Sequence, residues 1–358
     1  MQSHKLSFEE SLEKDVVSTH QCVGCATCVV VCPFNCLEYD RGQPRLVKKC
    51  EVCGICPQVC PKYNWSWSKT EKFVFGRQRK ENEDFGIYRR LTLAQATDKK
   101  ILKKCQDGGA VSALLVHALQ NGIIKGAALS GLAVDKPLYP MPKLATTPKE
   151  VLENAGTRYS YSPNMLALQE GVKQKKKSLA FVGTPCQIHA IRKLQMFPLK
   201  KYSNPLQFTV GLMCTESFTY SGLFEKHLSK NMGIDFNDIE KMNIKGKILV
   251  SLKSGETKSV SLSEAKQYTR ESCHLCDDFS AELADISAGG LGLSGWTFVI
   301  LRTENGEKTF DDAVAAGMLR TRAADEEPFA LTLLTKLSKK KRKNLQEADS
   351  FTLLSEPV

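Results

Sequence analysis

Long apolar segments are absent from this sequence of 358 residues. The strongest candidate, residues 110–119, is interrupted by His117 and followed by two polar residues. It is therefore shorter than the run of about 18 apolar residues that a membrane-spanning helix needs. The first residues also lack a basic start followed by an apolar stretch, so no secretory signal is expected. We predict a cytoplasmic protein without a transmembrane segment, which would reach the inner face of a membrane only through partner subunits.

Catalytic constellations of side chains are also missing. No triad and no pair of carboxylates stands out, and histidine is scarce, with 6 residues. The formal net charge is +11, but residues 91–322 show no module in which aromatic residues alternate with Lys and Arg, so we expect no nucleic acid as partner. Hydrophobic residues make up 42% and charged residues 25%, as in an ordinary globular protein of two or three domains.

Cysteine is what the sequence has in excess, with 14 residues. A disulfide framework would require a secreted protein, and the N-terminus gives no sign of secretion. Most of the cysteines fall early in the chain, and two more form Cys273-His-Leu-Cys276. We therefore expect reduced thiolates that bind metal.

Eight cysteines form two copies of the run C-x2-C-x2-C-x3-C-P, which begin at Cys22 and Cys50. Three thiolates of such a run hold three corners of a [4Fe–4S] cluster, and the fourth cysteine binds the other cluster. The two predicted ligand sets are Cys22, Cys25, Cys28 and Cys60 for one cluster, and Cys50, Cys53, Cys56 and Cys32 for the second.

A pair of zinc sites is the alternative for this region. Zinc ribbons supply cysteine in two pairs, so a repeated triplet with a distant fourth cysteine favours iron–sulfur clusters. Residues 37–47 predict a hairpin around Gly42, and residues 21–62 then resemble a bacterial two-cluster ferredoxin. Cys36 has no place in either ligand set, and we expect it to be a buried thiol.

From residue 91 the pattern is that of a mixed α/β or α+β domain. Residues 108–121 predict a helix with one apolar face, and residues 311–318 a second helix. Residues 304–306 are expected to form a turn. Apolar runs predict strands at 92–97, 126–134, 179–182, 208–213 and 296–303, and a hairpin over 248–261.

Four further cysteines suggest one more site. Cys186 and Cys214 each follow a predicted buried strand, and strand ends at one edge of a sheet converge. Together with Cys273 and Cys276 they suit either a zinc site or a third [4Fe–4S] cluster, and the spacing favours neither. A redox-active C-x-x-C pair is a weaker third reading. His274, between two ligands, is expected to face outward.

Two glycine patterns lead to different predictions about cofactor binding. Gly290, Gly292 and Gly295 match G-x-G-x-x-G, but the following residues predict a strand where a dinucleotide site needs a helix, so we reject a nicotinamide site. Gly108 and Gly109 open a predicted helix, where free backbone N–H groups suit an anion such as a cofactor phosphate. A plain helix cap by Asp107 explains this second pattern equally well.

Together these segments resemble the coenzyme F420 hydrogenase/dehydrogenase beta-subunit family, from about residue 91 to about residue 337. With the ferredoxin-like front end, the chain is most similar to the branch of the F420H2-oxidising subunit of archaeal F420H2 dehydrogenase. The motifs that carry the resemblance occur in the family's order: CQDGGAVSALL (105–115), GTRY (156–159), SPN (162–164), GTPCQ (183–187), GLMCTES (211–217), SCHLCD (272–277), AELADIS (281–287) and GWTFVILRT (295–303).

The resemblance implies FAD, a neighbouring pocket for coenzyme F420 as substrate, and a third [4Fe–4S] cluster on Cys186, Cys214, Cys273 and Cys276. The positions that it implies for FAD are Gly108, Gly109, Ser112, Arg158, Tyr159, Gly183 and Thr184. A flavin accepts a hydride and releases single electrons, so it would connect F420H2 to the clusters. The positive net charge suits a phosphate-bearing, glutamate-tailed coenzyme and acidic electron carriers.

The expected function is therefore that of an F420H2-oxidising iron–sulfur flavoprotein that passes electrons to ferredoxin or to other subunits of a complex. Alternatives are the F420-reducing beta subunit of a hydrogenase or formate dehydrogenase, and a subunit that only transfers electrons. A sulfite reductase would need additional chain to bind sirohaem. The predicted parts are an N-terminal extension (1–20), a ferredoxin-like domain (21–62), a connecting segment (63–90), two beta-subunit domains (91–178 and 179–337) and a solvated basic tail (338–358).

Overall fold

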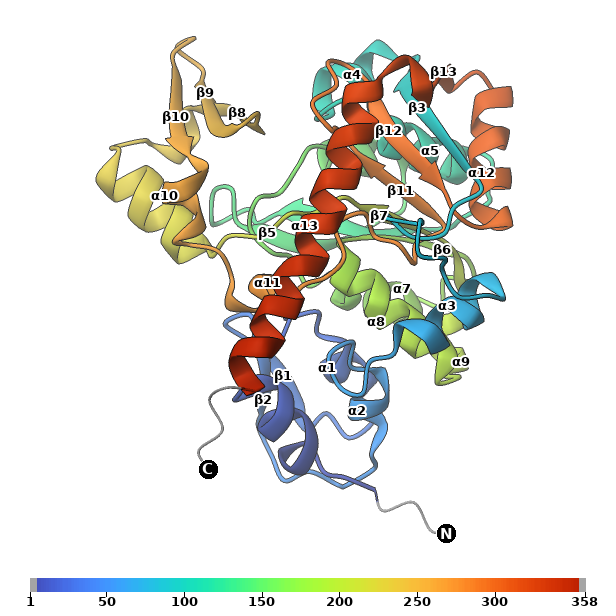
Figure 1. The fold of residues 1–358 in the computed structure, drawn as a ribbon, viewed down its shortest axis with the longest axis vertical. Helices are drawn as coiled ribbons and strands as arrows, with labels where there is room; N and C mark the ends of the chain where they lie inside the picture. Colours follow the sequence, from blue (N-terminus) through green and yellow to red (C-terminus); the bar gives the residue numbers. More distant parts are fainter. Residues whose placement is uncertain (1–4, 354–358) are drawn as a thin grey trace.

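A computed structural model describes residues 5–353, with side chains described up to residue 343. The ends of the predicted extension and tail, residues 1–4 and 354–358, lie outside this range. The body of the molecule is an eight-stranded mixed sheet in the order β13-β3-β12-β11-β7-β6-β4-β5, flanked by helices (Figure 1). This architecture confirms the predicted mixed α/β class.

The strands of the large sheet are short and mostly apolar. In β6 and β12 every residue is buried, as expected for strands that are covered on both faces. The bounds are β3 Arg90–Ala96, β4 Ala127–Leu132, β5 Pro140–Ala145, β6 Leu179–Gly183, β7 Leu206–Leu212, β11 Ile286–Gly289, β12 Thr297–Leu301 and β13 Leu319–Ala323.

The centre of the sheet is parallel, and its edges are antiparallel. Strands β4, β6, β7 and β11 pair in parallel, so their carboxyl ends meet at one edge of the sheet. Strands β12, β3 and β13 continue the sheet on one side, and β5 closes it on the other. The helices around it are α4 Lys99–Lys104, α5 Ala110–Gln120, α6 Pro148–Glu153, α7 Met165–Lys173, α8 Pro185–Met196, α9 Lys200–Ser203 and α12 Glu304–Ala315.

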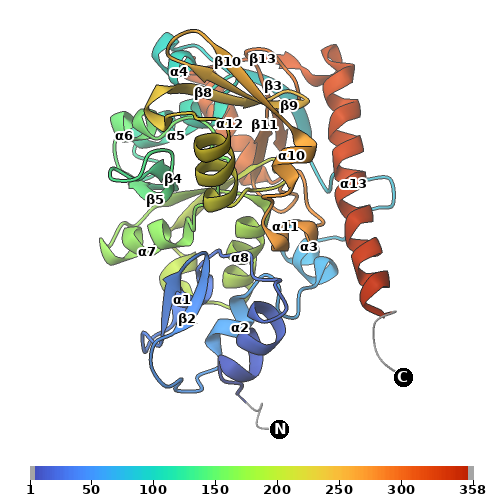
Figure 2. The same ribbon diagram turned by 90° about the vertical axis from the view of Figure 1, so that its left-hand side faces the viewer.

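The cysteine-rich N-terminal part lies against α7 and α8 (Figures 1 and 2). It contains η1 Glu9–Val17, α1 Thr27–Val31, α2 Ile55–Val59 and the predicted hairpin, β1 Leu37–Asp40 and β2 Gln43–Leu46. Gly24, with a φ of 67°, faces the hairpin, where a Cβ would lie 2.3 Å from the carbonyl oxygen of Gly42. Only glycine permits this approach of the first cysteine loop to the hairpin.

A small antiparallel sheet forms a separate lobe with its own core. Its strands are β8 Ile239–Ile244, β9 Lys247–Leu252 and β10 Thr257–Ser261, and the β9–β10 pair confirms the predicted hairpin. The lobe also contains η2 Tyr220–Asn231, η3 Phe236–Asp238 and α10 Leu262–Lys266. The short helix α11 Glu271–His274 leads from it back to the N-terminal part.

Two predictions about the C-terminal half are wrong. Residues 304–306 are not a turn but the start of α12, because Thr303 caps this helix by accepting a hydrogen bond of 3.1 Å from the N–H of Gly306. The predicted solvated tail belongs to α13 Pro328–Leu353, which follows η4 Ala324–Glu326 and runs along the molecule toward the N-terminal part (Figure 2). Ser338 and Lys341 on this helix are buried.

The connecting segment packs on the body. It contains α3 Trp67–Phe75, and Trp65 stacks on His189 of α8 with a centroid separation of 4.4 Å. Within residues 5–353 the helices are all too short or too polar to cross a membrane.

Candidate functional site

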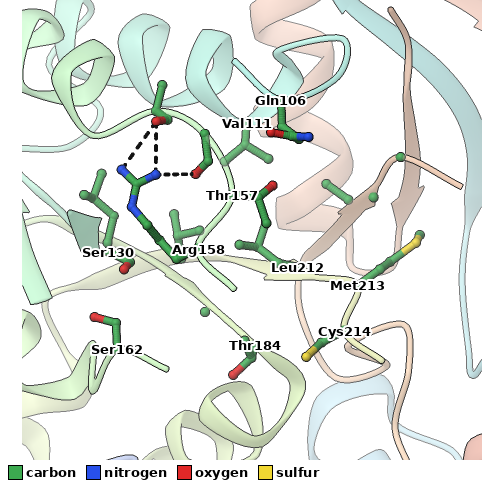
Figure 3. A pocket seen from close by; sticks show the side chains of 18 of the residues that line it. Gln106, Val111, Ser130, Thr157, Arg158, Ser162, Thr184, Leu212, Met213 and Cys214 are labelled. Carbon is green, nitrogen blue, oxygen red and sulfur yellow. Dashed lines mark hydrogen bonds between the residues drawn. The ribbon is translucent and has the colours of Figure 1, made fainter. Parts of the chain in front are cut away.

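A cavity of about 330 Å³ lies at the carboxyl ends of the parallel strands. The residues that follow β6, β7 and β11 line it, among them Thr184, Cys214 and Gly290. The opposite wall comes from the start of α5 and from the loop around Arg158 (Figure 3). This edge of an open α/β sheet is where such folds bind their ligands.

Six of the seven positions that the resemblance implied for FAD line this cavity: Gly109, Ser112, Arg158, Tyr159, Gly183 and Thr184. Gly108 is not among the lining residues. A Cβ on Gly108 would lie 2.4 Å from the carbonyl oxygen of Ala94 and 2.6 Å from the backbone nitrogen of Thr297. Gly108 therefore lets the start of α5 approach β3 and β12 closely, and Gly109 is the glycine at the cavity.

Arg158 is a partly buried cation in the cavity wall without a carboxylate partner among the described residues. Its guanidinium donates to backbone carbonyl oxygens only, including those of Asn154 at 3.1 Å and Gly156 at 3.2 Å (Figure 3). Burial lowers the pKa of Arg158 to about 10. A guanidinium in this setting is suited to bind an anion such as a phosphate.

Ser130 contributes an unsatisfied polar group to the cavity. Its Oγ is buried, lines the cavity and has no hydrogen-bond partner (Figure 3). Buried hydroxyl groups are nearly always hydrogen-bonded, so this one has a free donor and acceptor for a ligand. The free hydroxyl of Ser130 and the guanidinium of Arg158 fit a polar, anionic cofactor such as FAD.

The loop after β6 is fixed by its own sequence. Thr184 caps α8 in a capping box with Gln187, and Pro185 occupies the first turn of the helix. The cap places Cys186 in that first turn, where the hydroxyl of Thr184 lies 3.3 Å from its Sγ. Thr184 thus touches both the cavity and the third set of cysteines.

The four later cysteines lie together beside the cavity, and we call them the third cysteine group. Burial raises the pKa of Cys214, and the neighbouring thiols of Cys273, Cys186 and Cys276 raise it further. The backbone N–H of Ser217 donates to the Sγ of Cys273 at 3.5 Å. Cys214 itself lines the cavity, so a ligand in the cavity would border this group.

The N-terminal cysteines lie near one another in two groups, and the cluster ligand sets assigned from their spacing stay predictions. In the first group, burial and the neighbouring thiols of Cys60 and Cys186 raise the pKa of Cys22 to about 11. Burial also raises the pKa of Cys28, and the nearby Cys25, Cys22 and Cys60 add to this effect. Cys186 is close enough to Cys22 to act on its charge, so the first group lies near the third.

None of the four cysteines of the second group lines the cavity. Burial raises the pKa of Cys56 to about 12, and the neighbouring Cys53, Cys50 and Cys32 raise it further. The backbone N–H of Phe8 donates to the Sγ of Cys50 at 3.4 Å. Hydrogen bonds from N–H groups to the ligand sulfurs are among the interactions that set cluster potentials.

The donor chemistry of the three groups fits iron–sulfur clusters. Each group gathers four cysteine thiols. A thiol that binds a metal releases its proton to solvent, because the bond to the cation stabilises the thiolate and offsets the raised pKa. Within the described part of the chain, no three or more Cys, His, Asp or Glu side chains are arranged to hold a single metal ion. The three groups are candidate cluster sites on the chemistry of their thiols alone.

Other residues named in the sequence lie where expected. Cys36 is buried, at 2% exposure, and its thiol donates to the carbonyl oxygen of Lys49 at 3.3 Å. His274 is exposed. The glycines at 290–295 precede β12 rather than a helix, so the context required for a nicotinamide site is absent there.

Three candidate functional residues were not predicted from the sequence. Arg270 and Tyr161 lie between the first and third cysteine groups, and Lys341 of α13 lies beside the third. Arg270 precedes Cys273 by three residues and Tyr161 falls between two of the quoted motifs, which is the only local signal for either residue. Lys341 belongs to a basic run that resembles a solvated tail.

Comparisons with known proteins cover the body of the molecule from residue 91 onward. Residues 91–169 match the N-terminal part, and residues 176–327 the C-terminal part, of the coenzyme F420 hydrogenase/dehydrogenase beta subunit family. The chain belongs to this family. Residues 1–90 and the helix α13 fall outside the matched ranges.

Proteins with several different roles are similar to this chain. The coenzyme F420 hydrogenase subunit beta of Methanococcus voltae is 41% identical, over 76% of this chain and 99% of the relative. One subunit of the F(420)H(2) dehydrogenase of Methanosarcina mazei is 31% identical, over 83% of this chain and 83% of the relative. A chain of the F420-reducing [NiFe] hydrogenase complex from Methanosarcina barkeri has a TM-score of 0.72 at 37% identity, covering 75% of this chain and 94% of that chain.

Proposed function

We propose that this protein is an F420H2-oxidising iron–sulfur flavoprotein subunit. It would take a hydride from reduced coenzyme F420 onto FAD and release single electrons through three [4Fe–4S] clusters to ferredoxin or to other subunits of an oxidoreductase complex. Its membership in a family of F420-dependent oxidoreductase subunits supports the substrate class. The FAD, the clusters and the direction of electron flow are the parts that the proposal adds.

The observation that carries the proposal is the shared wall between the cavity and the third cysteine group. The cavity is lined both by the residues implied for FAD and by Cys214. A bound flavin, which exchanges hydride for single electrons, would therefore lie next to a one-electron acceptor. Arg158 and Ser130 would hold the polar part of the cofactor, and Gly109 would leave the start of α5 open to it.

The order of the cysteine groups supplies a one-electron route away from the cavity. The third group borders the cavity, Cys22 of the first group lies within electrostatic reach of Cys186 of the third, and Cys28 of the first group lies within electrostatic reach of Cys56 of the second. Electrons would pass along the groups in this order and leave through the N-terminal part. The chain would lie in the cytoplasm and dock its N-terminal part on an acceptor.

A second candidate is the F420-reducing beta subunit of a hydrogenase or formate dehydrogenase. The identity to the hydrogenase beta subunits favours it, and a formate dehydrogenase beta subunit from Methanocaldococcus jannaschii is 29% identical. The matched ranges of the family begin at residue 91. The two N-terminal cysteine groups therefore form an additional part, and they favour a subunit with its own electron outlet.

The test is anaerobic mixing of the reconstituted full-length protein with F420H2 and a one-electron dye. Return of the oxidised deazaflavin absorbance measures turnover, with NADH as the control donor. Turnover with F420H2 and not with NADH is expected. Absence of turnover in protein that holds FAD and about twelve irons would overturn the proposal and leave a protein that only transfers electrons.

A further inference from the structure

Arg270 and Tyr161 form a stacked pair between the N-terminal part and the body of the molecule. The guanidinium carbon of Arg270 lies 4.3 Å from the centre of the Tyr161 ring. Arg270 precedes α11, and its backbone N–H donates to the carbonyl oxygen of Ser217 at 3.0 Å. The pair is thus anchored in the body, on the loop that carries Cys273.

The guanidinium of Arg270 reaches across to the first cysteine loop. It donates to the carbonyl oxygen of Val23 at 3.0 Å and to that of Gly42 at 3.3 Å. A Cβ on Gly24 would lie 2.7 Å from Nη2 of Arg270, so the glycine between Val23 and Cys25 makes room for the guanidinium. One side chain therefore holds both the cysteine loop and the β1–β2 hairpin.

Tyr161 points the other way, toward the third cysteine group. Its hydroxyl lies 3.8 Å from the Sγ of Cys186, and the residue also lines the cavity. Tyr161 and Arg270 therefore form a continuous line of contacts from Cys186 to the loop that contains Cys22 and Cys25. In the described part of the chain no other stacked cation and ring adjoin two cysteine groups.

The charge of Arg270 is not neutralised by a carboxylate. None of the ion pairs formed by the described residues involves it. The titratable groups around it are instead Tyr161 and Tyr39, the thiols of Cys273 and Cys186 in the third group, and the thiol of Cys22 in the first. A cation between two sites favours negative charge at both, and each cluster gains one negative charge when it is reduced.

We propose that Arg270, held over the ring of Tyr161, is a positioning residue that joins the first and third cysteine groups and makes the clusters at both groups easier to reduce. The inference rests on the proposed function, because it requires clusters at these groups. Each passage between them moves one electron from the third group to the first, and no atom or proton is transferred. The second cysteine group has no contact with Arg270 and should be insensitive to it.

The experiment compares cluster midpoint potentials by redox titration followed by EPR in reconstituted full-length protein. Arg270→Gln removes the charge, Arg270→Lys keeps it, and Arg45→Gln removes an exposed charge from the same N-terminal part as the matched control. Arg45 is 63% exposed and lies near Glu38 and Asp40. Iron and flavin are measured on every preparation.

In Arg270→Gln we expect the midpoint potentials of the clusters at the first and third groups to fall by about 59 mV each. For a one-electron reduction this is about a tenfold change in the equilibrium constant. Arg270→Lys should leave both potentials close to those of the unmodified protein, and Arg45→Gln should change none of the three. Unchanged potentials in Arg270→Gln with full iron would overturn the inference. Equal shifts in Arg270→Gln and Arg270→Lys would also overturn it, because the charge would then not be the cause.

A second variant covers the case in which Arg270→Gln does not retain its iron. Tyr161→Leu removes the ring beneath the guanidinium without changing the net charge, and the same two potentials should fall. Potentials that stay unchanged in Tyr161→Leu would overturn the inference. Iron near eight in the unmodified protein would instead contradict the third cluster of the proposed function, so the two failures are distinguishable.

Discussion

Arg342 of α13 donates a hydrogen bond of 2.6 Å to Oε1 of Glu282, a carboxylate whose side chain is 1% exposed. Glu282 also forms an ion pair with Arg79 of the connecting segment, with 2.5 Å between Nη1 and Oε2. One buried carboxylate therefore ties the C-terminal helix and the connecting segment to the body. Both attached segments lie outside the ranges that match the family.

Replacing Arg342 should loosen this attachment. We expect Arg342→Ala to lower the free energy of unfolding by about 2 kcal/mol, since a hydrogen bond to a buried charged group contributes about 1.5–3 kcal/mol. Urea unfolding followed by circular dichroism measures the loss. The matched control is Arg322→Ala, whose pair with Glu326 is exposed and should contribute under about 1 kcal/mol. Equal effects of the two variants would contradict this account.

Asp285 predicts a pH dependence of stability. Burial alone would raise its pKa, but Arg192 and hydrogen bonds from Thr209 and Thr303 outweigh burial, so the pKa lies below its ordinary value. Because the folded state binds the proton less tightly than the unfolded state, the stabilisation is complete above the ordinary aspartate pKa. It is lost as the pH falls through the lower pKa of the folded state.

Asp285→Asn should therefore lower the free energy of unfolding more at neutral pH than in acid. We expect a loss of about 3 kcal/mol at pH 7, because Arg192 would remain buried without its partner, and a smaller loss below about pH 4. Urea unfolding at both pH values measures the difference. Asp311→Asn, at an exposed pair with Arg90, is the control and should show neither effect. A loss that does not change with pH would refute this assignment.

Arg158 should contribute to cofactor affinity more than to stability. It holds backbone carbonyl oxygens only and faces a cavity with an unsatisfied hydroxyl. We expect Arg158→Gln to weaken FAD binding by about tenfold to a hundredfold, as a charged hydrogen bond of about 1.5–3 kcal/mol implies. Titration of the flavin-free protein with FAD, followed by flavin fluorescence, measures the dissociation constant. Arg77→Gln, at an exposed ion pair, is the control, and equal affinities in both variants would refute the role.

The sequence was most informative where a motif is local. The two cysteine runs lie within single loops and helices, so their spacing predicts which thiols come together. The strands at Leu179–Gly183 and Leu206–Leu212 were predicted because buried central strands are continuous apolar runs. Their parallel pairing brings Cys186 and Cys214 together, as the convergence of strand ends at one edge requires.

The sequence was least informative where a residue acts through distant partners. Lys341 belongs to a run of five basic residues that resembles a solvated tail, yet it is buried at 8% exposure because α13 packs along the body. Arg270 contacts Val23 and Gly42, which lie more than two hundred residues away in the chain. The prediction of a turn at residues 304–306 was wrong for a local reason, since Thr303 caps a helix there.

Cys273 provides the most direct test of the third cluster. Its thiol lies among those of the third cysteine group and accepts the N–H of Ser217. Cys273→Ser should therefore lose about four of about twelve irons, because the serine cannot replace a thiolate ligand, while the two N-terminal groups stay intact. Iron analysis and the EPR spectrum of the reduced protein measure the loss. The matched control is Cys36→Ser, since Cys36 is equally a free thiol but is hydrogen-bonded to Lys49 outside every ligand set. Iron that stays near eight in the unmodified protein would favour zinc at the third group.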